Sequence, residues 1–188
     1  EGPARAAELD ARYPGRCVFI AVDVTSTEQV NRLVDETVAR FGRLDGVFNN
    51  AGIGGMSPAQ DYPDEDFLRI IDINLNGVFR VARAALKPMY AQGSGSIVNC
   101  ASILGVFGQS HTAAYTAAKG GIAALTHALA ASFSGKVRVN SISPGWIDTA
   151  YRTYEGPDAL QHPAGRVGNP MDIANMVLFL CSDKAGFI

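Results

Sequence analysis

The fold is decided by Ser96–Cys100 (SIVNC) and Val137–Ile142 (VRVNSI), two short apolar segments separated by a helical pattern from about Thr112 to Phe133. Both segments have the length and the β-branched content of buried strands. Parallel strands need a crossover connection of a dozen or more residues, and the predicted helix supplies one. The stretch therefore predicts a βαβ unit in a parallel sheet.

The same alternation of strands and helices continues toward both ends of the chain. Because no repeat or linker interrupts it, the predicted fold class is α/β, with a single domain over residues 1–188. Two further strands are predicted, at Cys17–Val22 (CVFIAV) and Gly46–Asn50 (GVFNN). Further helices are predicted from a capping box at Thr25–Glu28 to Gly42, from about Asp64 to Gln92, and over Met171–Cys181.

Composition and charge limit the classes of function. Of the 188 residues, 47% are hydrophobic and 18% are charged. The formal net charge is −2 and the sequence has no run of Lys and Arg, which disfavours nucleic-acid binding. No apolar stretch is long enough to span a bilayer, and no charged-then-apolar leader opens the sequence. Cys17, Cys100 and Cys181 are expected to be buried free thiols, and without a CxxC or HExxH pattern no metal site is expected. We therefore expect a cytoplasmic protein that binds neither nucleic acid nor a membrane.

Tyr115 and Lys119 lie one helical turn apart in the stretch AAYTAAKGG (113–121), so their side chains share a face of the predicted helix. An ammonium group near a phenol lowers its pKa from about 10, which would suit a general acid or base. Ser102, which follows a predicted strand, can donate to a carbonyl oxygen that Tyr115 protonates, or it can simply cap a turn. The surrounding Ala and Gly residues leave room for a large ligand, or alternatively for close helix packing between subunits.

Five segments occur in an order that is typical of one family. They are NNAG at 49–52, INLNG at 73–77, IVNCAS at 97–102, Tyr115-x-x-x-Lys119 and VNSISPGWIDT at 139–149. The chain closely resembles the short-chain dehydrogenases/reductases, in their single-domain branch. The resemblance covers nearly all of the sequence, including HPAGRVGNPMDIANMVLFLCSD at 162–183. It implies a Rossmann-type, doubly wound parallel sheet in three α/β/α layers, incomplete in this chain.

The resemblance also implies an activity and the residues that carry it. The protein would be an NAD(P)-dependent oxidoreductase that interconverts an alcohol and a ketone or aldehyde by hydride transfer. Tyr115 would be the acid/base, Lys119 would lower its pKa and hold the nicotinamide ribose, and Ser102 would orient the substrate carbonyl. Asn74 would anchor a water in a proton relay, or its side chain would only bond backbone groups.

The cofactor-binding residues implied by the resemblance fall into three groups beside Tyr115 and Lys119. Asp23 and Val24 would border the adenine. Asn49, Ala51 and Gly52 would line the adenosine side. Pro144, Gly145, Ile147 and Thr149 would meet the nicotinamide and the pyrophosphate. The choice between NAD and NADP is left open. A lid at Asp148–Asn169, with Tyr151, Tyr154 and His162, would give an amphipathic substrate pocket.

Other functions remain open at this point. One is a catalytically silent member of the family that acts as a binding or assembly module, and another is dehydratase or epimerase chemistry on the same scaffold. A hydrolase triad of Ser102 and His111 with an aspartate is disfavoured, because no G-x-S-x-G elbow surrounds Ser102.

The family's glycine-rich phosphate loop and its last strand have no counterpart in the sequence. Gly93-Ser94-Gly95 precedes a strand, and Gly52-Ile53-Gly54-Gly55 lacks the required spacing. We therefore expect a partial domain that binds dinucleotides weakly, with no backbone ladder between Cys17–Val22 and Gly46–Asn50, because the family places two other strands between them.

A homo-oligomer, a tetramer or a dimer, is also expected. Its interface would contain the helices at Asn76–Tyr90 and Thr112–Phe133. Their small-residue faces would include Ala82, Ala84, Ala85, Ala123, Ala124 and Ala128.

Overall fold

Three parallel strands form the central sheet of the protein. The structure, a computed structural model, describes residues 2–150 and 157–188. The strands β1 (Gly46–Asn49), β2 (Gly95–Cys100) and β3 (Val137–Ile142) are hydrogen-bonded in the order β1-β2-β3. The register pairs Val47 with Ile97 and Ile97 with Val139. The predicted βαβ unit is confirmed, since α5 (Ala113–Phe133) connects β2 to β3.

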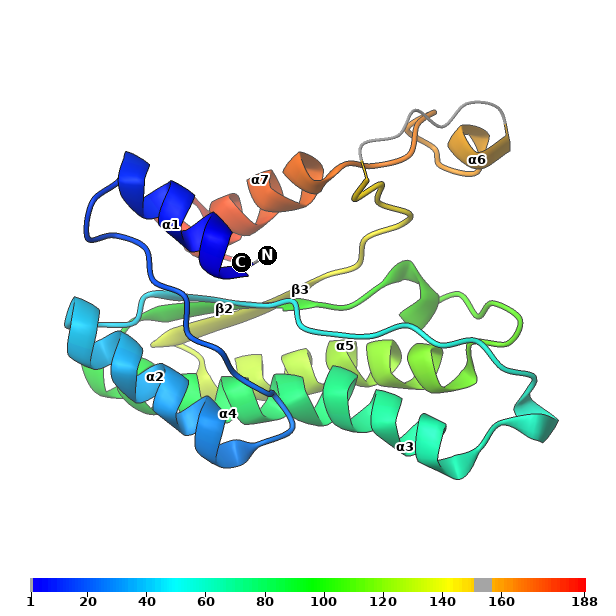
Figure 1. Ribbon diagram of the computed structural model, residues 1–188, viewed down its shortest axis with the longest axis horizontal. Coiled ribbons are helices and arrows are strands. Elements are labelled where there is room, and N and C mark those ends of the chain that lie inside the picture. Colours follow the sequence, from blue (N-terminus) through cyan, green and yellow to red (C-terminus); the bar gives the residue numbers. More distant parts are fainter. Residues whose placement is uncertain (1, 151–156) are drawn as a thin grey trace.

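Helices cover both faces of the sheet, which confirms the predicted three layers (Figure 1). On one face, α4 (Gly77–Gln92) and α5 pack against the strands, and α2 (Thr27–Phe41) packs against α4. On the other face, α7 (Pro170–Cys181) packs against β1 and β2, and α1 (Gly2–Arg12) lies on the same side as α7. A short helix, α6 (Pro157–Leu160), precedes α7. No helix in the described ranges is long and apolar enough to cross a membrane.

Local signals fix where the covering helices begin and end. The side chain of Ser26 caps α2 by accepting from the Gln29 N–H, so the helix begins one residue later than a box at Thr25 would place it. Gly42 ends α2 in a left-handed conformation, with φ of 80°, which a glycine adopts without strain. Asn169 and Asp172 form a complete capping box at the start of α7.

The segment Cys17–Val22 is extended but is not a strand, so this prediction is wrong. A strand needs a hydrogen-bonded neighbour, and within residues 2–150 and 157–188 β1 pairs with β2 alone. The segment instead lies beside α1, where the ring of Phe19 would clash with any side chain at Gly2. The prediction that no ladder joins Cys17–Val22 to Gly46–Asn50 is confirmed.

The helix predicted from Asp64 to Gln92 is divided by one turn of wider helix. It consists of α3 (Asp64–Ile71), the π-helical turn η2 (Asp72–Asn76) and α4.

The largest core cluster lies between α4 and the sheet, around Met89 and Ile97. The α4 alanines expected at a subunit interface, namely Ala82, Ala84 and Ala85, are buried inside the chain itself, so that part of the interface prediction is wrong.

Candidate active site

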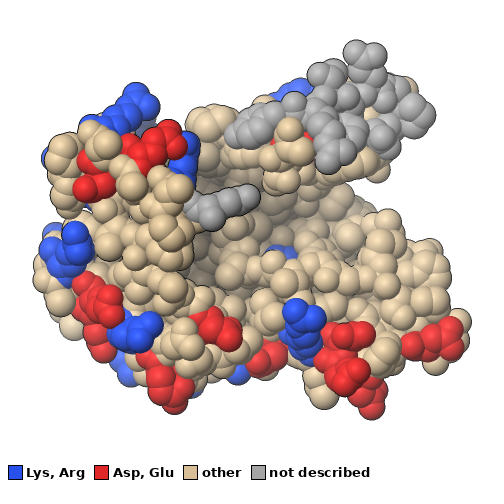
Figure 2. Space-filling model, viewed as in Figure 1, with Lys and Arg blue, Asp and Glu red and all other residues tan. Residues whose placement is uncertain are grey.

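A cavity of about 1350 Å³ lies between the carboxyl ends of the three strands and α7. Loops that follow parallel strands meet at this edge of a sheet, where open α/β folds bind ligands. Figure 2 shows the hollow between the two helix layers, with most charged side chains on the outer surface. The lining includes Gly52–Met56 after β1, Ser102–Leu104 after β2, Tyr115 and Lys119 of α5, and Pro144–Ile147 after β3.

Tyr115 and Ser102 both lie in the wall of this cavity, close enough for Ser102 to affect the pKa of Tyr115. Tyr115 is half-buried on α5, and Ser102 is buried just beyond the end of β2. The Ser102 hydroxyl also accepts from the Leu104 N–H at 3.2 Å and so caps the short helix η3 (Ile103–Gly105). The two roles considered for Ser102, chemistry and capping, are therefore compatible in one conformation.

The pKa of Tyr115 is raised, which is opposite to the expected direction. Burial of the phenol raises this pKa most, and the hydrogen bond with Ser102 opposes it. Lys119, expected to lower this pKa, does not offset the effect of burial; its ammonium donates to the carbonyl oxygen of Cys100 at 2.6 Å and lies 5.6 Å from the centre of the Tyr115 ring. Burial also lowers the pKa of Lys119, which is only 5% exposed.

Asn74 is fully buried in the π-helical turn and binds the backbone of Ile53 at both ends of its amide. Its Oδ1 accepts from the Ile53 N–H and its Nδ2 donates to the Ile53 carbonyl, each at 2.8 Å. A Cβ atom at Gly52 would lie 3.2 Å from Asn74 Oδ1 and 3.8 Å from Lys119 Nζ. The side chains of Asn74 and Lys119 therefore meet at Gly52, while the relay role of Asn74 stays a prediction.

The cavity brings together only some of the expected cofactor residues. Asp23, Val24, Asn49 and Ala51 do not line it. Asn49 points into the fold, where its amide donates to Asn99 Oδ1 at 2.9 Å, and Asp23 is an exposed residue whose carboxylate accepts from the N–H and hydroxyl of Thr25. Those that do line the cavity, with Tyr115 and Lys119, are Gly52, Pro144, Gly145, Ile147 and Thr149.

The small residues around Tyr115 and Lys119 serve packing within the chain. Ala114 and Ala118 are fully buried in a cluster with Ile70. A Cβ at Gly105 would lie 2.7 Å from the backbone carbon of Lys119, so only glycine lets η3 approach α5 this closely. The sequence predicted that these small residues leave room for a ligand or allow contact between subunits. Packing within the chain was not predicted, because it depends on which distant segment lies against α5.

The contribution of α7 to the cavity wall was also not predicted from the sequence. Ile173, Ala174, Val177 and Leu178 line it, and their i, i+1, i+4, i+5 spacing marks one face of a helix. From the expected lid, His162 lines the cavity and packs against Gly145, whereas Tyr151 and Tyr154 lie outside the described residues.

Comparison with known proteins finds a family model, curated relatives and solved structures that are similar to this chain. A family model described as enoyl-(acyl carrier protein) reductase matches residues 1–188. A 3-alpha-(or 20-beta)-hydroxysteroid dehydrogenase of Mycobacterium tuberculosis is 40% identical over 190 residues, which is 100% of this chain and 71% of the relative. The solved structure of NAD+-bound xylitol dehydrogenase has a TM-score of 0.82 and 37% identity, over 90% of this chain and 74% of the other. The solved structure of ElxO with NADP bound has a TM-score of 0.90 and 31% identity, over 98% of this chain and 79% of the other.

Proposed function

Because the chain belongs to the short-chain dehydrogenase/reductase family, we propose that Tyr115, Ser102 and Lys119 serve the interconversion of an alcohol and a ketone or aldehyde. The protein is an NAD(P)-dependent oxidoreductase that acts on CH–OH groups. The observation that carries the residue assignment is that Ser102, Tyr115 and Lys119 line the same cavity, with Lys119 one helical turn from Tyr115.

The cavity is large enough for the nicotinamide end of a dinucleotide together with a substrate. Its volume of about 1350 Å³ exceeds the usual range for small-molecule pockets, about 300–1,000 Å³. Lys119 would hold a ribose of the cofactor through its ammonium, and the Pro144–Ile147 backbone would lie beside the nicotinamide. When bound, the nicotinamide supplies or accepts the hydride.

The protein's own groups handle the proton. In the direction of reduction, Tyr115 donates its hydroxyl proton to the oxygen of the substrate carbonyl, and Ser102 donates a hydrogen bond to the same oxygen. Because burial raises the pKa of Tyr115, the phenol stays protonated at neutral pH. This protonation state favours reduction over oxidation, since oxidation needs the phenolate as a base.

The finer features of the function are also proposals. NAD and NADP remain equally supported, because each occupies a solved relative. The substrate would be amphipathic, since the cavity combines Trp146 and Ile103 with polar groups. A homo-oligomer and a cytoplasmic location are proposed as well, the latter supported by three free cysteines. The alternative of a silent assembly module has no support in the relatives, whose names denote enzymes.

The experiment that tests this proposal follows the absorbance of NADH and NADPH with a panel of cyclic and open-chain ketones. Net consumption of reduced cofactor with formation of the alcohol supports the proposed oxidoreductase. Product formation with the cofactor recycled would instead indicate epimerase or dehydratase chemistry. Absence of any turnover by the protein across the panel would count against the assignment of Tyr115, Ser102 and Lys119.

A further inference from the structure

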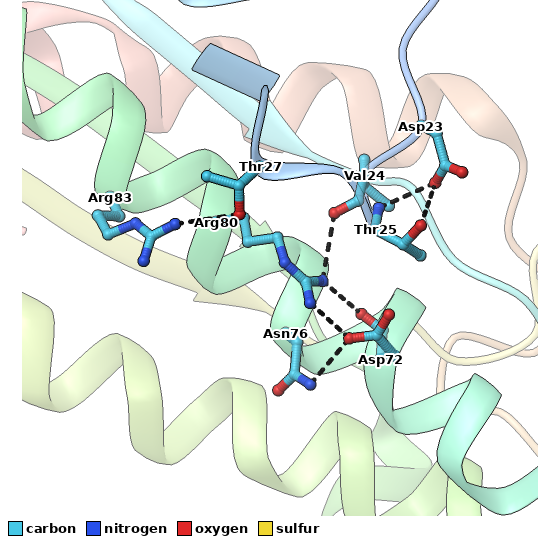
Figure 3. Close-up of polar contacts among 8 residues, drawn as sticks. All are labelled: Asp23, Val24, Thr25, Thr27, Asp72, Asn76, Arg80 and Arg83. Atoms are coloured by element: carbon cyan, nitrogen blue, oxygen red, sulfur yellow. Dashed lines mark hydrogen bonds and ion pairs between the residues drawn. The ribbon is translucent and has the colours of Figure 1, made fainter. Parts of the chain in front are cut away.

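Arg80 on α4 joins two segments that are far apart in the sequence (Figure 3). Its guanidinium donates to Asp72 Oδ1 at 2.6 Å and to the Asp72 carbonyl at 3.3 Å. It also donates to the carbonyl of Val24 at 3.4 Å. The side chains of Arg80 and Asp72 are 19% and 38% exposed, so the Arg80 end of this ion pair is the more shielded one. One side chain therefore connects the loop at 23–25 with the first residue of the π-helical turn η2.

The residue that closes this turn is held by the same loop. The Gly77 N–H donates to the Asp72 carbonyl, which is the bond that gives the turn its wider, π-helical geometry. A Cβ atom at Gly77 would lie 2.9 Å from Val24 Cγ2, so Val24 packs directly on the backbone of Gly77. Val24 thus touches one end of the turn through its side chain and the other end through Arg80.

The π-helical turn also carries Asn74, which binds a residue of the cavity wall. Asn74 lies in the middle of η2 and binds both backbone polar groups of Ile53, which lines the cavity. Its Oδ1 also lies close to Gly52, where Lys119 approaches. A shift in the backbone of η2 would therefore move the Gly52–Ile53 wall relative to Lys119.

We propose that Arg80 is a positioning residue of the active site, which holds η2 and the loop at 23–25 in one arrangement and through Asn74 fixes the Gly52–Ile53 wall beside Lys119. The consequence for catalysis rests on the function proposed above. The proposed role of Arg80 in holding η2 and the loop at 23–25 does not rest on that function, because these contacts exist without cofactor or substrate. Wider helical turns occur frequently at functional sites.

Arginine suits this position better than lysine does. Three acceptors converge on the two terminal nitrogens of Arg80, and the rigid guanidinium fork serves them at once, whereas an ammonium is a compact point charge. Asp72 is a matching partner, since hydrogen bonds from Asn76 and Arg80 hold the pKa of its carboxyl below the usual value. The pair is therefore charged throughout the neutral range.

The test compares Arg80→Gln and Arg80→Lys with Arg83→Gln. Arg83 is a matched control because it lies on the same helix and contacts the neighbouring Thr27 hydroxyl at 3.4 Å, but it makes no contact with η2. Two amide protons report the clamp directly in hydrogen exchange, those of Ile53 and Gly77, whose bonds are to Asn74 and Asp72. The Ile97 amide in the core strand β2 reports global unfolding.

In Arg80→Gln we expect exchange at Ile53 and Gly77 to rise about tenfold or more, with Ile97 unchanged. We expect kcat to fall about ten- to hundredfold with a smaller change in the substrate KM, because the catalytic groups are misplaced rather than removed. Arg80→Lys should recover part of both effects, and Arg83→Gln should behave as the wild type.

Wild-type exchange at Ile53 and Gly77 in Arg80→Gln would overturn the proposal. So would an equal rise at Ile97, which would show a general loss of stability, or an equal effect in Arg83→Gln. If Arg80→Gln unfolds, Arg80→Lys decides by the same comparison of amides. If the wild type turns over no carbonyl compound, the proposed function fails, and the exchange result still decides whether Arg80 positions the wall.

Discussion

At the scale of single residues, the assignment of Tyr115 rests on one atom. Its ring packs in the wall of the cavity, but only its hydroxyl can transfer a proton. Replacing Tyr115 with Phe removes that atom and keeps the ring. We expect turnover to fall about 10²- to 10⁴-fold, the usual contribution of a general acid, while cofactor affinity stays nearly intact. Steady-state rates and calorimetric titration of the cofactor measure the two effects, with Tyr90→Phe at an exposed site as the control.

An unchanged rate in Tyr115→Phe would remove Tyr115 from the mechanism. A variant that keeps more than half of the wild-type rate is inconsistent with any role for the hydroxyl as the proton donor.

Lys119 gives a second prediction at this scale. Its ammonium lies against the Cys100 carbonyl and near the Tyr115 ring, so Lys119→Ala removes a positive charge that can serve both a ribose and a phenolate. We expect weaker cofactor binding and a lower rate together. In the oxidation direction, the pH at which the rate rises should move upward, since without the ammonium the phenolate is less stable and the Tyr115 pKa is higher. An unchanged pH profile and an unchanged cofactor affinity would exclude the dual role.

The presence of Ser102, Tyr115 and Lys119 in one site was predictable from the sequence, but their partners were not. The order of the short motifs identified Tyr115, Lys119 and Ser102, because spacing along a helix and after a strand is a local property. Which acceptor Lys119 binds, and how far burial shifts the pKa of Tyr115, depends on groups supplied by distant segments. The same applies to Asn74, whose amide is occupied by Ile53.

At the scale of elements, the approach of η3 to α5 depends on Gly105. A Cβ at this position would lie 2.7 Å from the backbone carbon of Lys119 and 2.8 Å from the Gly120 nitrogen. Backbone atoms cannot move aside as a flexible side chain does, so Gly105→Ala should push η3 away from α5. We expect destabilisation of about 1–3 kcal/mol from overpacking and a loss of activity of up to about a hundredfold, because Ser102 and Lys119 lie on the two separated elements.

Chemical denaturation and steady-state rates check this prediction, and Gly108→Ala is the matched control. Gly108 lies in the same segment and has no atom within 4 Å of its would-be Cβ. If Gly105→Ala matches Gly108→Ala in both stability and rate, the close approach is not needed for the site.

Elements with a strong local pattern were predictable, and the failures have physical causes. The strands at β1, β2 and β3 and the helices α2, α5 and α7 were found within a residue or two, since apolar periodicity and capping residues are local. The turn η2 was missed because one wider turn hardly disturbs the periodicity of a long helix. Cys17–Val22 has the composition of a strand, but strand formation depends on a neighbour that the segment itself cannot specify.

At the scale of the whole molecule, α5 presents a stripe of small side chains to solvent. Ala82, Ala84 and Ala85 on α4 are used internally, but Ala117, Ala124, Ala128 and Ala131 are exposed and share one face of α5. Small residues let two helix backbones approach closely, so this face suits contact with a second copy of the chain.

We expect the protein to sediment as a dimer or tetramer at micromolar concentration, and Ala128→Arg to shift it toward the monomer by placing a long charged side chain in the contact. Ala11→Arg, at an exposed alanine on α1, is the matched control and should leave the oligomer unchanged. A wild-type protein that sediments as a monomer, or an Ala128→Arg variant with an unchanged sedimentation coefficient, would show that α5 is not the contact surface.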